Sequence, residues 1–558
     1  MPTPGRVGVL QRRHSPRPPR LRPLCLMLAA SLALLAGGPV AAQGAPAPAP
    51  ALRLPSLGES ASDEFGLSAE KRVGEEIMRE IRRDPDYLDD AVLLAYVQSL
   101  WQPLVKAAQA RGDIGVDTAT LFPYEAFLVR DRSVNAFALP GGYVGVHLGL
   151  IAMTSSPDEL ASVLAHELSH VTQRHIARSV TAGSRSSSLS LAAMLLGLLV
   201  AGRTGNADVA QAAIASGQAA MVQAQLNFSR DMEREADRNG FALMADAGFA
   251  PSGMAAMFDK LDQANRLNDS GGFPYLRSHP LTVDRIGEAR QRVETNGSVT
   301  LPPPTLRHML MQARARVLMD ASVQALRRLQ DLDRRAAETA APWAERLAAA
   351  TGAALASTQL RDFARAERAA QQLVALQAAA PADAIDATTA RDLRHLAAEL
   401  ALARADLPAA RQALLPDSAD ASRTSLLLRA RLALADGQPA GLRSSSEALQ
   451  TWLAEHRHDG SAWMLMGQTA DRQGLKLRAV RAEAEAQAAL GNLQGAIDRL
   501  RAGQQLARSG QAAPDFIELS VIDSRLRDLQ GQRRQLMAEQ QQGQRGNRPD
   551  NGEGNLHD

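Results

Sequence analysis

The chain has 558 residues, of which 45% are hydrophobic and 22% are charged, proportions typical of globular proteins. At about 150 residues per domain, this length predicts two to four folded units. Six arginines and no acidic residues lie within the first 42 positions, so the rest of the chain has more acidic than basic side chains. Without a basic surface that attracts phosphates, we expect no nucleic-acid partner.

Residues 1–42 have the pattern of a secretory signal peptide: an arginine-rich start, an apolar run from Leu24 to Leu35, and small residues before Gln43. The apolar run is shorter than the about 20 residues that span a bilayer, so we expect cleavage near Gln43 rather than a membrane anchor. The single cysteine, Cys25, lies inside this segment, so the mature protein should have no disulfide. An exported protein without disulfides is compatible with the bacterial periplasm.

The following segments alternate between helical and strand patterns. Residues 43–60 are rich in alanine and proline, which predicts a flexible lead-in. Apolar periodicity then predicts helices over 68–82 and 89–107. A small sheet is predicted from two β-rich runs and the turn between them: 124–129, Pro140-Gly141-Gly142 and 143–147.

A helix that begins at residue 157 carries the most specific motif. Ser156 is its expected N-cap, Pro157 takes the first helical position, and Glu159 completes a capping box. An HExxH motif spans residues 166–170 of this helix. Residues four apart differ by about 40° of rotation, so His166 and His170 project toward one metal ion. Glu167 can then take a proton from the water that a zinc ion activates.

A catalytic zinc keeps three protein ligands and an open position, so a third ligand is required. On a continuous helix His175 lies about 180° around from the first motif histidine, and Gln173 stands where a metzincin has a helix-breaking glycine, so His175 fits a structural or outer role. Glu233 is the better candidate, because Asp237 lies one turn later on the same face and can fix a histidine tautomer. On spacing alone, Glu235 remains a rival ligand.

Between the two motif helices lies a low-complexity insert, 184–220, rich in serine, alanine and glycine around the apolar run 189–201. This run is too short to cross a membrane as a helix. Two interpretations stay open: a buried hairpin or lid helix, or a flap that touches the membrane surface or the substrate. A polar helix is predicted next, over 223–247, and Gly248 closes it.

The prolines at 302–304 mark the end of a domain that spans 61–300. Beyond them, residues 305–530 are alanine-rich, with predicted breaks near Gly352, Pro381, Gly437, Gly474, Gly491 and Gly510. The pattern indicates a tetratricopeptide-like α-solenoid, although the repeat signals around Trp463 and Ala489 do not share one register, and a generic helical bundle is the alternative. Residues 531–558, rich in glutamine, glycine and arginine, are expected to be disordered. The predicted fold is mainly α with a small β-sheet.

Four motifs together resemble one protease family. They are Asn135–Gly142, the stretch from His166 to His175, Ser229-Arg230 with Glu233–Asp237, and Ser278-His279-Pro280 with Arg285. Over roughly residues 60–295 the chain is similar to the gluzincin family of the CAAX prenyl protease and the heat-shock protease HtpX, which implies a zincin-like metalloprotease domain. The resemblance implies one Zn²⁺ per chain, bound by His166, His170 and Glu233. Asp237 would contact a ligand of the zinc rather than the zinc itself.

The resemblance also implies roles for residues outside these two helices. An edge strand that aligns the substrate backbone is implied for Ala136, Phe137, Ala138, Gly141 and Gly142. The loop with His279 and Arg285 is implied to reach the active site. A neutral His279 in the fourth zinc position would displace the catalytic water and hold the enzyme inactive, whereas the alternative is a hydrogen bond within the loop or to substrate. Arg285 would stabilise the oxyanion once the loop has moved.

The order of export signal, zinc protease and helical repeats resembles periplasmic proteases of outer-membrane protein assembly. We therefore expect a periplasmic zinc metalloendopeptidase that degrades unfolded or misassembled outer-membrane proteins. Its repeats would contact the β-barrel assembly machinery. If the insert is a flap rather than a buried hairpin or lid helix, the run 189–201 would make a peripheral contact with the membrane. The alternatives are a repeat-based chaperone or adaptor with occasional proteolysis, and a maturation enzyme for one exported substrate.

Overall fold

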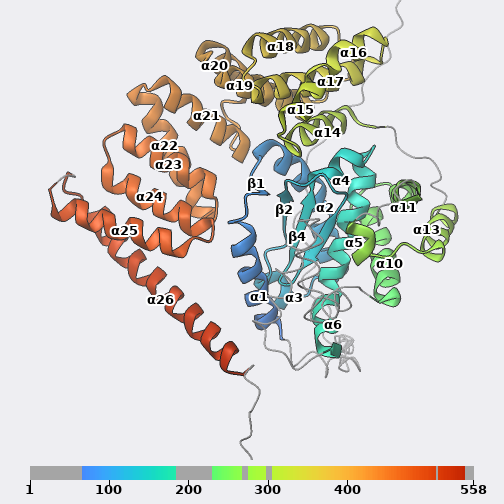
Figure 1. Cartoon of the computed structure of the whole chain (residues 1–558), viewed down its shortest axis with the longest axis horizontal. Coiled ribbons are helices and arrows are strands. Elements are labelled where there is room, and N and C mark those ends of the chain that lie inside the picture. Colours follow the sequence, from blue (N-terminus) through green and yellow to red (C-terminus); the bar gives the residue numbers. More distant parts are fainter. Residues whose placement is uncertain (1–65, 184–228, 267–273, 297–303, 511–512, 547–558) are drawn as a thin grey trace, which may run out of the picture. The chain divides into compact units, whose positions relative to one another are not determined.

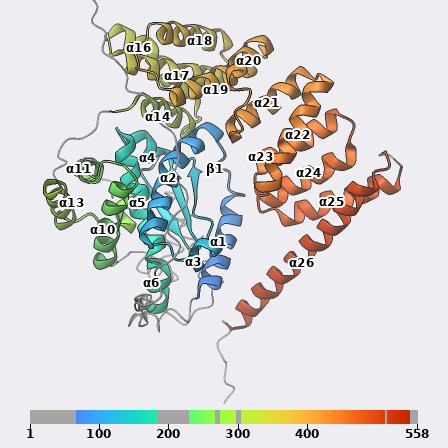
Figure 2. The same cartoon turned by 180° about the vertical axis from the view of Figure 1, so that it is seen from behind.

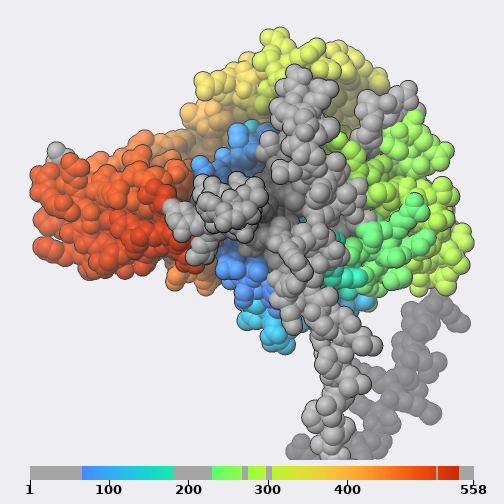
Figure 3. All heavy atoms as spheres, turned by 60° about the horizontal axis from the view of Figure 1, so that its bottom comes forward, coloured from blue at the N-terminus to red at the C-terminus, as the bar shows by residue number. Residues whose placement is uncertain are grey.

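The computed structural model describes residues 66–183, 229–266, 274–296, 304–510 and 513–546 (Figure 1). The grey spheres of Figure 3 mark residues outside this set. The predicted signal peptide (1–42), the lead-in (43–60), the insert (184–220) with its apolar run (189–201) and the end of the predicted tail (547–558) all lie outside the described residues. Among the described residues, no helix combines the length and apolar character needed to cross a membrane.

The part of the chain before residue 297 contains a small sheet and several helices. The strands are β1 (Tyr87–Leu88), β2 (Glu125–Val129), β3 (Ala136–Leu139) and β4 (Tyr143–His147). The helices are α1 (Leu67–Ile81), α2 (Ala91–Arg111), α3 (Val116–Leu121), α4 (Leu148–Met153), α5 (Pro157–Thr172), α6 (His175–Gly183), α10 (Arg230–Asp246), α11 (Ser252–Arg266), α12 (Pro274–Ser278) and α13 (Val283–Thr295). The predicted helices at 68–82, 89–107 and 157 onward are confirmed, as are the two predicted strands.

The four strands lie in the order β1-β2-β4-β3. β2 and β4 are parallel, with Glu125 opposite Tyr143, whereas β3 pairs antiparallel with β4. β3 therefore forms an edge of the sheet although it lies between β2 and β4 in the chain. Gly141 and Gly142 connect β3 to β4 with φ angles of 77° and 90°, a conformation that glycine adopts without strain.

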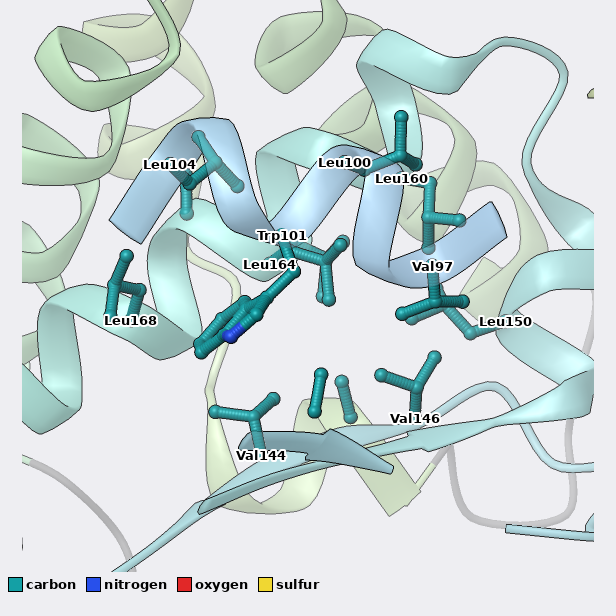
Figure 4. Close-up of a cluster of buried hydrophobic side chains, with 14 of the residues drawn as sticks. Val97, Leu100, Trp101, Leu104, Val144, Val146, Leu150, Leu160, Leu164 and Leu168 are labelled. Atoms are coloured by element: carbon teal, nitrogen blue, oxygen red, sulfur yellow. The ribbon is translucent and has the colours of Figure 1, made fainter. Parts of the chain in front are cut away.

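The main hydrophobic core lies between the sheet and helices α2 and α5 (Figure 4). Trp101 of α2 is buried at its centre, and its indole nitrogen donates a 2.6 Å hydrogen bond to the carbonyl oxygen of Tyr124. Leu160, Leu164 and Leu168, four residues apart along α5, contact this core (Figure 4). Because α5 is anchored by its apolar face, the motif histidines on it have fixed positions.

The start of α5 is fixed by side-chain hydrogen bonds. Ser156 is the N-cap, and its hydroxyl accepts from the backbone N–H of Glu159 at 3.2 Å. The Glu159 carboxylate accepts from the backbone of Ser155 (2.6 Å) rather than of the N-cap, and Lys260 lies 2.5 Å from the same oxygen. The predicted N-cap is confirmed, with the return bond of the capping box displaced by one residue.

The region after residue 304 is helical throughout its described elements, and successive helices lie side by side (Figure 2). They are α14 (Leu306–Leu318), α15 (Val323–Gln330), α16 (Leu332–Glu338), α17 (Trp343–Gln359), α18 (Phe363–Ala378), α19 (Ala387–Ala403), α20 (Leu407–Leu414), α21 (Arg423–Asp436), α22 (Pro439–Glu455), α23 (Gly460–Arg472), α24 (Lys476–Ala489), α25 (Leu493–Arg508) and α26 (Phe516–Gly546), with a 3₁₀ turn, η2 (Leu415–Asp417). The mainly helical fold with a small sheet is confirmed, whereas the tetratricopeptide register stays a prediction.

Two sequence expectations in this region are wrong. The break predicted near Gly352 does not occur, because this glycine is buried in the middle of α17, on the side that faces Ala313 of α14. The tail predicted to be disordered from residue 531 is helical as far as Gly546. Conversely, Arg361 and Ala405 end helical segments with φ angles of 55° and 58°, and neither residue type signals such a turn.

Helix α14 connects the two regions. Met311 and Ala315 contribute to the core of the sheet region, whereas Leu310 and Val317 contribute to the core formed with α17. On the same helix, Nδ1 of the buried His308 forms a 2.6 Å hydrogen bond with a tyrosine hydroxyl of α2. The expected boundary at residues 300–305 therefore precedes a helix that both regions share.

Candidate active site

The HExxH residues lie where α5 packs against α10. His166 and His170 are 2% and 1% exposed, and their Nε2 atoms lie 3.0 Å apart. Gly240 of α10 permits this close packing, since a Cβ at that position would lie 3.1 Å from the backbone nitrogen of His166. The two imidazoles therefore face the same point between the helices.

Glu233 and Asp237 approach the histidines from α10. The Oε2 atom of Glu233 lies 3.5 Å from Nε2 of His166, and its Oε1 atom lies 3.4 Å from Nε2 of His170. Asp237 contacts the other side of the first imidazole, with Oδ1 3.0 Å from Nδ1 of His166. Glu233 thus faces the Nε2 edge of both rings, and Asp237 lies at the opposite side of the His166 ring.

His279, immediately after α12, completes the cluster. Its Nδ1 lies 3.0 Å from Oε1 of Glu233 and 3.3 Å from Nε2 of His166. Its Nε2 lies 3.5 Å from Oε1 of Glu167. Tyr275 stacks on the imidazole with the ring centroids 4.7 Å apart, so α12 holds the ring in this orientation.

The geometry of the cluster fits a metal ion. His166, His170, Glu233 and His279 each offer one ligand atom, and these atoms lie within 4.8 Å of one another. Ligands about 2.1 Å from a tetrahedral zinc lie about 3.4 Å apart, close to the distances between neighbouring donors here, 3.0 to 3.4 Å. Both carboxylate oxygens of the fully buried Glu167 lack a hydrogen-bond partner among the described residues, as expected for a group that contacts a metal-activated water.

Charge is distributed unequally over the cluster. Burial alone would lower the pKa of His166, but its contacts with Asp237 and Glu233 raise it to about 10. Burial prevails at His170 and holds its pKa well below the usual value, so this imidazole is neutral. Burial would raise the pKa of Asp237, yet hydrogen bonds from Arg285 and His166 lower it to about 2. A cation bound beside Glu233 would replace the proton on Nε2 of His166.

Residues 95–293 match the sequence model of peptidase family M48. The beta-barrel assembly-enhancing protease of Yersinia pestis is 30% identical over 481 residues, which cover 85% of this chain and 91% of that protein. This chain belongs to peptidase family M48. It is therefore a metalloprotease, and the family resemblance read from its motifs is confirmed.

Two further M48 relatives carry the same name. A beta-barrel assembly-enhancing protease of Escherichia coli K12 is 29% identical over 475 residues, 82% of this chain and 88% of the relative. A putative one from Vibrio cholerae serotype O1 is 37% identical over 295 residues, 53% of this chain and 56% of its own length. The similarity to the first of these extends well beyond the M48 segment, which agrees with an architecture of protease followed by helices.

The structure corrects the geometric argument about His175. That argument required a continuous helix, but α5 ends at Thr172 and Arg174 takes a φ angle of 51°, after which α6 begins at His175. The imidazole therefore turns back toward the site, with its Nδ1 2.9 Å from Nδ1 of His170. Glu235, the rival ligand, contacts His175 at 3.0 Å rather than the metal cluster.

Arg285 contacts both carboxylates of α10 in this structure. Its guanidinium donates two hydrogen bonds to Asp237, at 2.7 and 2.8 Å, and lies 2.7 Å from Oε2 of Glu233. It donates a third hydrogen bond, 2.9 Å long, to the carbonyl oxygen of Pro280. These contacts orient the two carboxylates and the His279 loop, so the expected oxyanion contact would require them to break.

The expected substrate-aligning segment lies at the sheet edge beside α5. Ala136 is buried, whereas Phe137 and Ala138 of β3 are partly exposed. The β3–β4 turn packs against α1, since a Cβ on Gly141 would lie 3.4 Å from the carbonyl oxygen of Glu70. The buried carboxylate of Glu70 accepts a hydrogen bond from Arg174 at 2.9 Å. Neither Glu70 nor Tyr275 was found from the sequence, because a single Glu in an amphipathic helix and a lone Tyr carry no motif. Substrate alignment by this edge stays a prediction.

Proposed function

We propose that this metalloprotease is a zinc endopeptidase of the periplasm that degrades unfolded or misassembled outer-membrane proteins. The observation that carries the proposal is the buried cluster of two motif histidines and Glu233 beside Glu167, whose carboxylate has no hydrogen bond among the described residues. The names of the relatives from three bacteria associate them with β-barrel assembly. The export signal expected from the sequence agrees with such a location.

In the proposed site, His166, His170 and Glu233 bind one Zn²⁺. The bound zinc supplies a Lewis acid that activates water and polarises the scissile carbonyl group. Glu167 accepts the proton of that water and later delivers it to the leaving amine, because it lies next to the ligands and accepts no hydrogen bond from the described residues. Asp237 lies 3.0 Å from Nδ1 of His166, a position that favours a proton on Nδ1 and so directs the lone pair of Nε2 toward the metal.

His279 is proposed to occupy the fourth ligand position in the resting enzyme. Its Nδ1 stands at a ligand-to-ligand distance from both Glu233 and His166, and its Nε2 faces Glu167. With this imidazole in place, neither water nor a scissile carbonyl can enter the coordination shell. Activity then requires the loop after α12 to move, and the edge strand β3 receives the substrate backbone as an added antiparallel strand.

The helical region is proposed to bind client proteins and the β-barrel assembly machinery. It comprises α14 to α26, and its first helix packs into the protease core, so the two regions are mechanically connected. The large helical region and its packing against the protease core favour a second function. In it, the protein delivers client proteins and cleaves only those that fail to assemble.

Purified wild-type chain and Glu167→Gln, each with and without zinc, would be incubated with an unfolded β-barrel precursor. The proposal expects zinc-dependent cleavage by the wild type, and stable binding without cleavage by Glu167→Gln. A matched control is Glu80→Gln, which removes an exposed carboxylate paired with Arg83 and should leave cleavage unchanged. Cleavage by Glu167→Gln at the wild-type rate contradicts the proposed chemistry, and full cellular function of that variant favours the delivery role.

A further inference from the structure

The two motif histidines have different partners on their outer nitrogens. Nδ1 of His166 contacts a carboxylate directly, at Asp237. Nδ1 of His170 instead lies 2.9 Å from Nδ1 of His175, which is completely buried. The other nitrogen of His175, Nε2, lies 3.0 Å from Oε2 of Glu235. On the side of its Nδ1 atom, His170 therefore reaches the carboxylate of Glu235 through another imidazole.

The carboxylate of Glu235 determines the direction of the hydrogen bonds from His170 through His175. Arg178 donates to Oε2 of Glu235 at 3.0 Å, which favours the ionised carboxylate. An ionised carboxylate only accepts hydrogen bonds, so Nε2 of His175 must donate to it. In neutral His175 the Nδ1 atom then has no proton and must accept from Nδ1–H of His170. This leaves the lone pair of His170 on Nε2, the atom that faces Glu233 and His166.

We propose that His175 and Glu235 are positioning residues that fix the metal-binding tautomer of His170, an inference that rests on the proposed zinc site. The relay depends on the break after α5, since Arg174 in the left-handed conformation is what returns His175 toward the site. The side chain of Arg174 is held by the buried Glu70 at 2.9 Å. Glu235, which the spacing alone left as a possible metal ligand, would thus act on the metal site through the imidazole of His175.

Zinc affinity tests the relay through Glu235→Gln and His175→Phe, measured by competition with a chromophoric chelator. A carboxamide can donate as well as accept a hydrogen bond. In Glu235→Gln the hydrogen bonds from His170 through His175 therefore no longer have a single direction. We expect zinc to bind about 10- to 100-fold more weakly in both variants, the range typical of lost outer partners of metal ligands. Glu80→Gln is the matched control and should bind zinc as the wild type does. Should His175→Phe fail to fold, Glu235→Gln, which alters a partly exposed side chain, carries the test.

A second measurement reports the tautomer itself and needs no metal. ¹⁵N-histidine NMR of the metal-free protein should show His170 with its proton on Nδ1 in the wild type and in Glu80→Gln, and a mixture of tautomers in Glu235→Gln. Wild-type zinc affinity in Glu235→Gln, or an unchanged His170 tautomer in that variant, overturns the relay. A wild-type protein that binds no zinc overturns the proposed metal site instead, so the two failures are distinguishable.

Discussion

Nδ1 of His279 lies 3.0 Å from Oε1 of Glu233, close enough for both residues to bind one ion. If His279 blocks the fourth position, His279→Ala should cleave an unstructured substrate faster than the wild type, by roughly 10-fold or more when the blocked form prevails by 1.4 kcal/mol. The measurement is the initial rate on a casein-like substrate with zinc content determined in parallel.

The control for this prediction is His458→Ala, which removes an exposed histidine of the helical region. It should cleave at the wild-type rate. A His279→Ala protein that keeps its zinc and is no more active than the wild type would show that His279 does not block the site.

Arg285 should contribute strongly to the stability of the metal-free protein. Its guanidinium is 3% exposed and neutralises the buried carboxylates of Asp237 and Glu233. Arg285→Met leaves both without their cation, and losing one partner of a buried ion pair costs about 3–5 kcal/mol in the free energy of unfolding. Urea unfolding with chelator present measures this. Arg290 lies on the same helix as Arg285 and forms an exposed ion pair with Asp259, so Arg290→Met should cost less than about 1 kcal/mol in the free energy of unfolding. Equal losses in the two variants would refute the role assigned to Arg285.

Glu233 and Glu235 should differ in their effect on metal binding. Glu233→Ala removes a proposed ligand, whereas Glu235→Ala removes a residue that lies outside the cluster and contacts the imidazole of His175. We expect Glu233→Ala to lose stoichiometric zinc at micromolar concentrations and Glu235→Ala to retain it with weaker affinity. Equilibrium dialysis against zinc distinguishes the two. Identical isotherms would leave the choice of ligand without support.

Gly74 of α1 should tolerate no side chain. A Cβ there would lie 2.0 Å from the carbonyl oxygen of Pro140, which belongs to the backbone of the β3–β4 turn. Gly74→Ala is expected to lower the free energy of unfolding by about 1–3 kcal/mol, because the turn must move. Gly287, inside α13, has no neighbour within 4 Å of such a Cβ, so Gly287→Ala should raise stability by roughly 0.5–1 kcal/mol. The urea midpoints of the two variants should shift in opposite directions.

Local signals in the sequence were sufficient for the elements that carry the chemistry. Ser156 and Pro157 mark the start of α5, and the spacing of His166 and His170 predicts a shared face, because both depend only on helix geometry. The resemblance to a known family supplied the choice of Glu233 over Glu235, which spacing alone left open. The structure then placed Glu233 between the two imidazoles.

The contacts that the sequence could not predict depend on unusual backbone or on long-range packing. Arg174 turns the chain in a left-handed conformation that arginine rarely adopts, so the return of His175 toward the site had no local signal. Gly352 was interpreted as a helix break, because the sequence of α17 alone does not show that this helix packs on α14. The pairing of Arg285 with Asp237 spans 48 residues and requires α10 and α13 to be placed first.

Zinc content of the purified chain tests the central claim most directly. Mass spectrometric metal analysis would compare the wild type with His166→Ala, His170→Ala and Glu167→Gln. We predict one zinc per chain in the wild type and in Glu167→Gln, which should be inactive, and no stoichiometric zinc in either histidine variant. Loss of zinc from Glu167→Gln, or full zinc occupancy in His166→Ala, would contradict the assignment of these residues.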